Sequence, residues 1–162
     1  MGSFDVSSEI DRQEVRNAID QTARELATRY DFKNTDTSVE LGESTITLRS
    51  GSEDRLVAAR QVTEEKLVRR KVSLKAVSWG EVAAAAGASV RQEATLVAGI
   101  SSEKAKEINK AIKELGLKGI QSQTQGEQVR VTAKKRDALQ EVIAALKEKD
   151  FGIPLQFGNF RD

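Results

Sequence analysis

The chain has 162 residues, and its 26 Lys and Arg side chains nearly balance 25 Asp and Glu, for a net charge of +1. It contains no Cys and no His, which excludes disulfides, zinc sites built from these residues, Cys nucleophiles and His acid–base catalysis. The charge balance lacks the basic excess typical of many nucleic-acid-binding domains, so any phosphate binding has to depend on local patches.

The composition also predicts where the protein resides. No apolar run approaches the roughly 20 residues that a membrane-spanning helix needs. The N-terminal segment is acidic and lacks the basic start and apolar stretch of a signal peptide. We therefore expect a cytoplasmic protein with no membrane contact.

Apolar periodicity predicts six elements in the first half of the chain. Asp11 is placed to cap the first helix, and Ser50 or Ser52 the second. In chain order the elements are a strand at 3–6, a helix at 11–30, strands at 39–41 and 46–48, a helix at 52–67 and a strand at 72–77. A linker is expected at 79–89, where the sequence WGEVAAAAGAS has no firm periodicity.

The second half repeats this order. It reads as a strand at 90–97, a helix at 102–115, strands at 120–125 and 128–133, a helix at 139–146 and a terminal strand at 155–158. The strand–turn–helix segments 45–62 and 128–145 match residue by residue, with Leu48 corresponding to Val131 and Leu56 to Leu139. A repeat of this length indicates two copies of one small α/β domain rather than a solenoid.

The order β-α-β-β-α-β in each half predicts an α+β protein with two tandem ferredoxin-like domains. Their sheets are antiparallel, with both helices on one face. The predicted domains are 1–78 and 90–162, joined by the linker 79–89. Each half is near the lower size limit for an independent core, so we expect the halves to support each other.

The sheet face opposite the helices carries polar side chains in both halves, as strand alternation predicts. In the second half these are Gln121, Gln123, Gln125, Gln128, Arg130 and Thr132, and in the first half Ser38, Glu40, Thr45, Thr47 and Arg49. Gln side chains both donate and accept, so they suit base edges, and Arg suits phosphate. The alternative is a solvated or inter-domain polar face. No aromatic residue lies on the central hairpins, which argues against the stacking mechanism of standard RNA-recognition domains.

Three further residues are candidates for nucleotide contacts. Lys134 and Arg136 follow a strand and begin a helix, where backbone N–H groups and the helix dipole add to their charge. Trp79, the only tryptophan, lies at the predicted domain junction. There it either fills the seam or stacks on a purine.

Catalysis is the minority hypothesis. No phosphate-loop, dinucleotide-binding or nucleophile-elbow motif is present. The acidic residues Asp5, Glu9, Asp11 and Asp31 could only serve an enzyme through a bound divalent cation, and helix capping accounts more simply for Asp11. We therefore expect no catalytic residues, no metal site and no cofactor.

Several segments resemble the YajQ family of bacterial nucleotide-binding proteins. The most specific are DFK at 31–33, QGE-x-VRVT at 125–132 and NFRD at 159–162, and the resemblance covers nearly the whole chain. It implies two ferredoxin-like domains that can exchange terminal strands, so the strand at 155–158 can belong to the first domain's sheet. It also implies binding of nucleotides such as cyclic di-GMP in some members and RNA in others, and contact with a transcription factor in some.

These observations favour a non-enzymatic nucleotide-binding regulator that takes cyclic di-GMP, ATP, GTP or another purine nucleotide. The first alternative is an RNA- or tRNA-binding protein. The second is a protein-interaction adaptor for a transcription factor. The copies differ outside their cores, because Ser50-Gly51-Ser52 stands where the second copy has Ala133-Lys134-Lys135. We therefore expect the second copy to carry the binding site.

Overall fold

The structure is a computed structural model that describes residues 1–162. The chain divides into two compact units. Unit 1 comprises Met1–Glu9 and Ala98–Asp162, and unit 2 comprises Ile10–Val97. None of the helices is long and apolar enough to cross a membrane.

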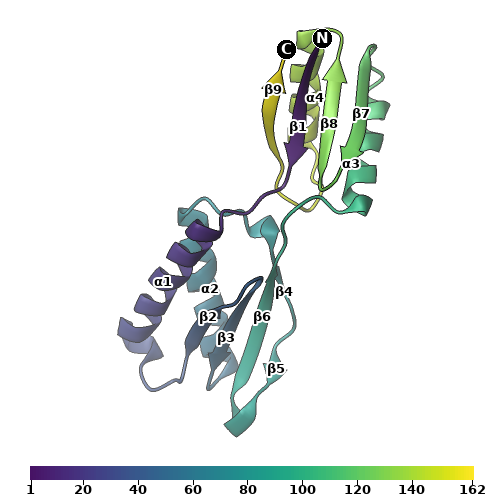
Figure 1. The fold of residues 1–162 in the computed structure, drawn as a ribbon. Coiled ribbons are helices and arrows are strands. Elements are labelled where there is room, and N and C mark those ends of the chain that lie inside the picture. The colour runs from purple at the N-terminus through teal and green to yellow at the C-terminus, as the bar shows by residue number, and fades with distance from the viewer. The chain divides into compact units, whose positions relative to one another are not determined.

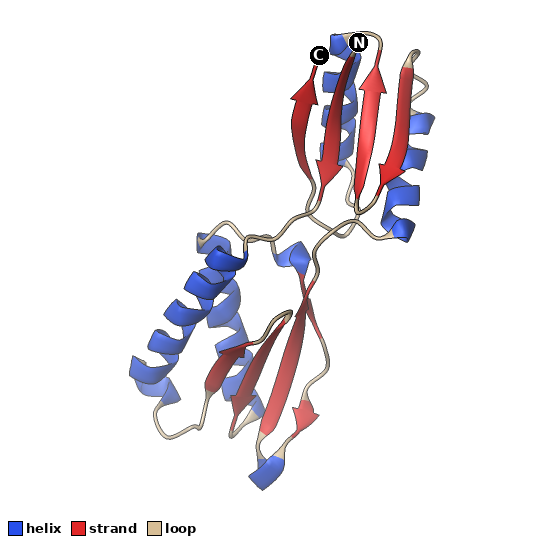
Figure 2. Cartoon of the chain, viewed as in Figure 1, coloured by secondary structure: helices blue, strands red, loops and turns tan.

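Unit 1 contains a four-stranded antiparallel sheet in the order β7-β8-β1-β9, with two helices on one face (Figures 1 and 2). Its elements are β1 (Gly2–Ser7), α3 (Ser102–Glu114), β7 (Ile120–Gln125), β8 (Gln128–Ala133), α4 (Arg136–Glu148) and β9 (Gln156–Arg161). This is the split β-α-β arrangement, in which β1 and β7 are separated by β8.

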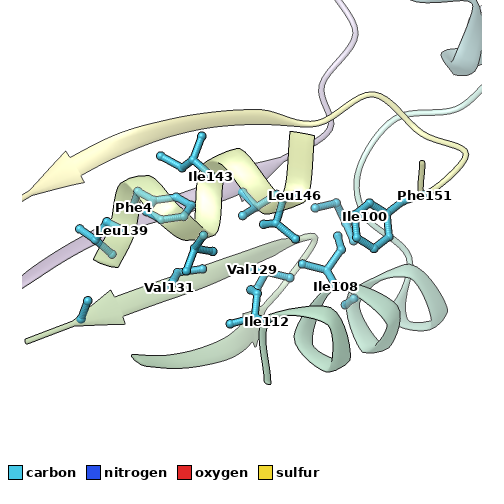
Figure 3. Packing of buried hydrophobic residues seen from close by; sticks show 14 of the residues in the cluster. Phe4, Ile100, Ile108, Ile112, Val129, Val131, Leu139, Ile143, Leu146 and Phe151 are labelled. Atoms are coloured by element: carbon cyan, nitrogen blue, oxygen red, sulfur yellow. The ribbon is translucent and has the colours of Figure 1, made fainter. Parts of the chain in front are cut away.

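The core of unit 1 lies between this sheet and the two helices (Figure 3). Phe4 of β1 and Val131 of β8 are fully buried in it, together with Ile108 of α3 and Val142 of α4. Alternate residues of each strand point to this layer, which leaves the other set on the opposite face.

Unit 2 has a five-stranded sheet in the order β2-β3-β6-β4, with the short strand β5 also paired to β6. Its elements are α1 (Arg12–Thr28), β2 (Ser38–Leu41), β3 (Thr45–Ser50), α2 (Glu53–Arg69), β4 (Val77–Trp79), β5 (Ala83–Ala84) and β6 (Val90–Leu96), with short 3-10 helices at Tyr30–Phe32, Leu74–Ala76 and Ala86–Ala88. Both α-helices cover one face of the sheet (Figure 2).

The predicted fold class is confirmed, since both units are ferredoxin-like with antiparallel sheets and helices on one face. The repeat is visible in the cores: Leu48 and Val131 are both fully buried on the second strand of the hairpins β2-β3 and β7-β8, and Leu56 and Leu139 are buried on the helix that follows. Asp11 caps α1 as predicted, because its carboxylate accepts from the N–H groups of Gln13 and Glu14.

The strands are distributed differently from the predicted domains 1–78 and 90–162. β1 lies in unit 1 between β8 and β9, whereas β6 lies in unit 2 between β3 and β4. The N-terminal half of the chain thus supplies β1 to the sheet that the C-terminal half otherwise builds, and the C-terminal half supplies β6 to the sheet of the N-terminal half. We call β1 and β6 the leading strands. The strand predicted at 155–158 pairs with β1 in unit 1 and not with the sheet of unit 2. The physical reason is that β1 and β6 have the same apolar alternation. The local sequence pattern therefore does not distinguish a place in the sheet of unit 1 from a place in the sheet of unit 2.

The predicted linker 79–89 and the strand predicted at 72–77 also differ from the structure. Trp79 ends β4, and Ala83 and Ala84 pair with β6. Leu74–Ala76 forms a 3-10 helix because the Ser73 hydroxyl accepts from the Lys75 N–H at 3.2 Å, which stabilises a helical turn in place of an extended strand.

Candidate functional site

The open face of the unit 1 sheet is polar along all four strands. Across β7, β8, β1 and β9, one row is Gln121, Thr132, Ser3 and Arg161, and the next is Gln123, Arg130, Asp5 and Gly158. A third row places Gln125 opposite Gln128 and Ser7 opposite Gln156. The predicted residues Gln121, Gln123 and Gln125 are therefore on one face of one strand, and all three are exposed.

At the centre of this face Arg130 binds Asp5. The Arg130 Nε–H donates to Asp5 Oδ1 at 2.9 Å, and the Asn159 amide donates to Asp5 Oδ2 at 2.7 Å. Asp5 is 8% exposed, and the Arg130 guanidinium, assisted by Asn159, holds the pKa of its carboxyl below the ordinary value. Much of the positive charge predicted for phosphate binding at Arg130 is thus already matched by an internal carboxylate.

This ion pair makes the stability of unit 1 depend on pH. The pKa of Asp5 is lower in the folded than in the unfolded protein. The contribution of the ionised carboxylate to the free energy of unfolding is therefore complete above the unfolded pKa of about 3.9, and it is lost as the pH falls through the folded pKa. We expect Asp5→Asn to be less stable than the wild type at neutral pH, with a difference that shrinks below about pH 4.

Urea denaturation of both proteins between about pH 7 and pH 3 measures this difference. Glu148→Gln is the control, because Glu148 is exposed at the end of α4. A stability difference for Asp5→Asn that stays constant across this range would contradict the assignment.

A cavity of about 510 Å³ adjoins the open face and passes around the edge strand β7 to α3. It is lined by Asn109, Ile112, Lys113, Leu117, Ile120, Gln121, Ser122, Gln123, Arg130 and Thr132. The apolar lining comes from the α3 side of the strand, and the Gln and Arg side chains come from the open face. The cavity therefore offers an apolar surface beside hydrogen-bonding groups, as small-molecule sites commonly do.

Two residues of α3 in this cavity were not among the predicted site residues. Lys113 has no ion pair, in contrast to Lys110, which lies 3.9 Å from Glu114. The Asn109 amide donates to Thr124 Oγ1 at 3.0 Å, but its Oδ1 atom is buried without a donor. A buried acceptor without a partner costs about 1–3 kcal/mol. The regular Lys and Glu pattern of this helix concealed both residues, because it is typical of a solvated surface.

Lys134 and Arg136 lie at the start of α4, outside this cavity. Both are exposed, and Lys135, the residue before the helix, makes no side-chain cap. Arg136 forms an ion pair with Asp162, so part of its charge is matched. The structure therefore brings Gln121, Gln123 and Arg130 together, and leaves Lys134 and Arg136 at the end of the sheet.

Trp79 and Arg49 belong to unit 2. Trp79 is opposite Ala94 on the helix-covered side of its sheet, where it packs against the core and the Arg60 guanidinium lies 5.8 Å from its ring. Its side chain thus packs within unit 2 and does not lie on the open face of that sheet. Arg49 is exposed on the open face of β3, in a different sheet from Arg130.

Three of the four acidic residues considered for a metal have other partners. Arg130 binds Asp5, Asp11 caps α1, and Asp31 pairs with Arg29 and Arg55 at 2.7 and 3.0 Å. No three acidic side chains converge in a way that could hold a metal ion.

The fold and this face define a class: two-unit ferredoxin-like proteins with an open polar sheet face and an adjoining cavity. The chain belongs to the YajQ family, since the family model described as "Nucleotide-binding protein YajQ-like" matches residues 2–161. The resemblance seen in the sequence is thereby confirmed.

Curated relatives match over almost their full length. A protein of Rhodococcus erythropolis is 56% identical over 160 residues, which is 98% of each chain. Proteins of Mycobacterium avium and Desulfitobacterium hafniense are each 51% identical and cover 98% of this chain. All three bear the name "Nucleotide-binding protein" and none is named as an enzyme.

Proposed function

We propose that the protein is a non-enzymatic nucleotide-binding regulator of the cytoplasm, and that the nucleotide occupies the cavity beside β7. The observation that carries this proposal is a cavity that contains Lys113, which has no ion pair, together with the amides of Gln121 and Gln123 and the apolar side chain of Ile120. The names of the relatives support the same ligand class.

The cavity groups match the parts of a nucleotide. A Gln amide can donate to and accept from one base edge. Ile120 and Leu117 supply an apolar surface for the flat side of the base. The Lys113 ammonium, which has no internal partner, is available for phosphate. Arg130 would orient its remaining N–H donors toward the ligand while Asp5 holds the guanidinium in place.

The test is calorimetric titration with ATP, GTP and cyclic di-GMP of the wild type, Lys113→Gln and Gln123→Ala. We expect Lys113→Gln to weaken binding about tenfold, which corresponds to the loss of one charge-assisted contact. Lys110→Gln is the matched control, because Lys110 is on the same helix and is paired with Glu114 outside the cavity. No saturable binding, or equal losses in the two Lys variants, would reject the site.

Arg130→Ala is a poor first variant for this purpose. Removal of the Arg130 side chain leaves the buried Asp5 carboxylate without its main partner, so a loss of binding could not be separated from a loss of stability.

RNA binding is the second candidate, favoured by the width of the open face, which has polar side chains on all four strands. Titration with tRNA at two salt concentrations distinguishes it, because the affinity of an RNA complex falls steeply with salt whereas that of a small nucleotide changes less. Capture of a transcription factor with and without nuclease tests the adaptor role.

A further inference from the structure

A second cavity, of about 760 Å³, lies between the two helices of unit 2, and no strand contributes to its lining. We call it the helix groove. It contains two carboxylates and five cationic side chains, which are Arg24, Lys66, Arg69, Arg70 and Lys71. Every lining residue is polar or charged, whereas the cavity beside β7 includes three large aliphatic side chains. The two cavities therefore suit different ligands.

Two ion pairs across the groove join α1 to α2. The buried Lys66 Nζ lies 2.9 Å from Glu25 Oε1, and an Arg70 guanidinium nitrogen lies 3.6 Å from Glu14 Oε2. Both carboxylates of the groove are thus already matched by cations of α2. Their pairing fixes the walls of the groove, and it leaves neither carboxylate free to repel an incoming anion.

The cations Arg24 and Lys71 remain without a carboxylate. Neither forms an ion pair, although the neighbouring Arg69 pairs with Glu65 at 2.8 Å. Cations in the last turn of a helix are stabilised by its dipole, and this accounts for those of α2. It does not account for Arg24, because α1 has no basic residue in its last turn and Arg24 precedes that turn.

Lys71 follows α2 in a left-handed backbone conformation. Its φ angle is +63°, in a region that suits Gly, and α3 ends with Gly116 at +66°. The Lys71 N–H donates to the Val68 carbonyl at 3.0 Å, and the N–H of the next residue closes this Schellman turn at 2.9 Å. The chain thus places a cationic side chain in the groove at a position where Gly would be less strained. Strain of this kind is typical of functional positions.

The lining of the groove also restricts the chemistry of a ligand. It offers no apolar or aromatic surface for the flat side of a base. Guanidinium and ammonium groups both bind phosphate oxygens. Because Arg24 belongs to α1 and Lys71 follows α2, a ligand with several linked phosphates can contact both sides of the groove at once.

We propose that the helix groove is a binding site for inorganic polyphosphate, with Arg24 and Lys71 as the groups that hold its phosphates. The site lies within unit 2 and is separate from the cavity beside β7. It does not depend on the proposed nucleotide site.

The test is calorimetric titration with tripolyphosphate of the wild type, Arg24→Gln and Lys71→Gly. Each variant is expected to bind about tenfold more weakly, which corresponds to the loss of one charge-assisted contact. Lys33→Gln is the matched control, because Lys33 is an exposed lysine of unit 2 outside the groove. This control should bind as the wild type does.

Three results would overturn the proposal. The first is a wild type without saturable binding of tripolyphosphate. The second is an equal loss in Lys33→Gln, which would show an effect of net charge alone. The third is binding of citrate as tight as that of tripolyphosphate, which would show that the groove attracts any multivalent anion and does not select linked phosphates.

Thermal melting without ligand distinguishes a binding role of Lys71 from a structural one. Lys71→Gly is expected to melt at the same temperature as the wild type or higher, since Gly relieves the left-handed strain. A lower melting temperature with unchanged binding would assign Lys71 to stabilisation of α2 and contradict the proposal. Cyclic di-GMP has no phosphate chain, so any binding of it should be the same in Lys71→Gly and the wild type.

Discussion

Replacing Phe4 with Ala is expected to lower the free energy of unfolding of unit 1 by about 3–5 kcal/mol. Phe4 is fully buried on β1, the strand between β8 and β9, and it packs among residues of α3, α4 and β8 (Figure 3). Truncation to Ala removes the buried ring atoms and leaves a cavity, because the surrounding sheet and helices relax only partly.

Phe160→Ala is the matched control, because this ring belongs to the same sheet but is 58% exposed. Urea denaturation followed by far-ultraviolet circular dichroism reports both units, whereas fluorescence of the single tryptophan, Trp79, reports unit 2. A loss seen equally by Trp79 fluorescence and circular dichroism would contradict the assignment of β1 to unit 1.

The reciprocal substitution is Leu96→Ala, which is expected to destabilise unit 2 by about 2–5 kcal/mol. Leu96 is on β6 opposite Val77 and is buried in the core that includes Val15 and Leu67. The Trp79 fluorescence transition should therefore shift to lower urea, although Leu96 lies in the half of the sequence that otherwise builds unit 1.

Val97→Ala is the control for this variant, since Val97 is the adjacent residue and is 37% exposed. An unchanged Trp79 transition in Leu96→Ala would show that β6 does not stabilise unit 2. Together with Phe4→Ala, the measurement tests the exchange of leading strands from both directions.

The glutamine surface could be predicted because a strand has a period of two residues. Once Val129 and Val131 are assigned to the core, Arg130 must face the other way, and Gln121 and Gln123 follow on the neighbouring strand. No such rule places Asp5 beside Arg130. The two residues are 125 positions apart, and they meet only because β1 inserts next to β8.

Two site residues on α3 were not predicted. Lys113 and Asn109 lie on a helix whose exposed side carries many charges, and the cavity beside β7 distinguishes them from Lys110.

Local pattern was sufficient for the elements, the duplicated core and the fold of each unit, because 3.6-residue and two-residue periodicities depend only on neighbours in the chain. The tertiary structure decided which strand enters which sheet, since β1 and β6 have interchangeable apolar alternation and only the packing of the whole unit distinguishes them. That choice sets Asp5 beside Arg130, and the polar face of unit 1 depends on it.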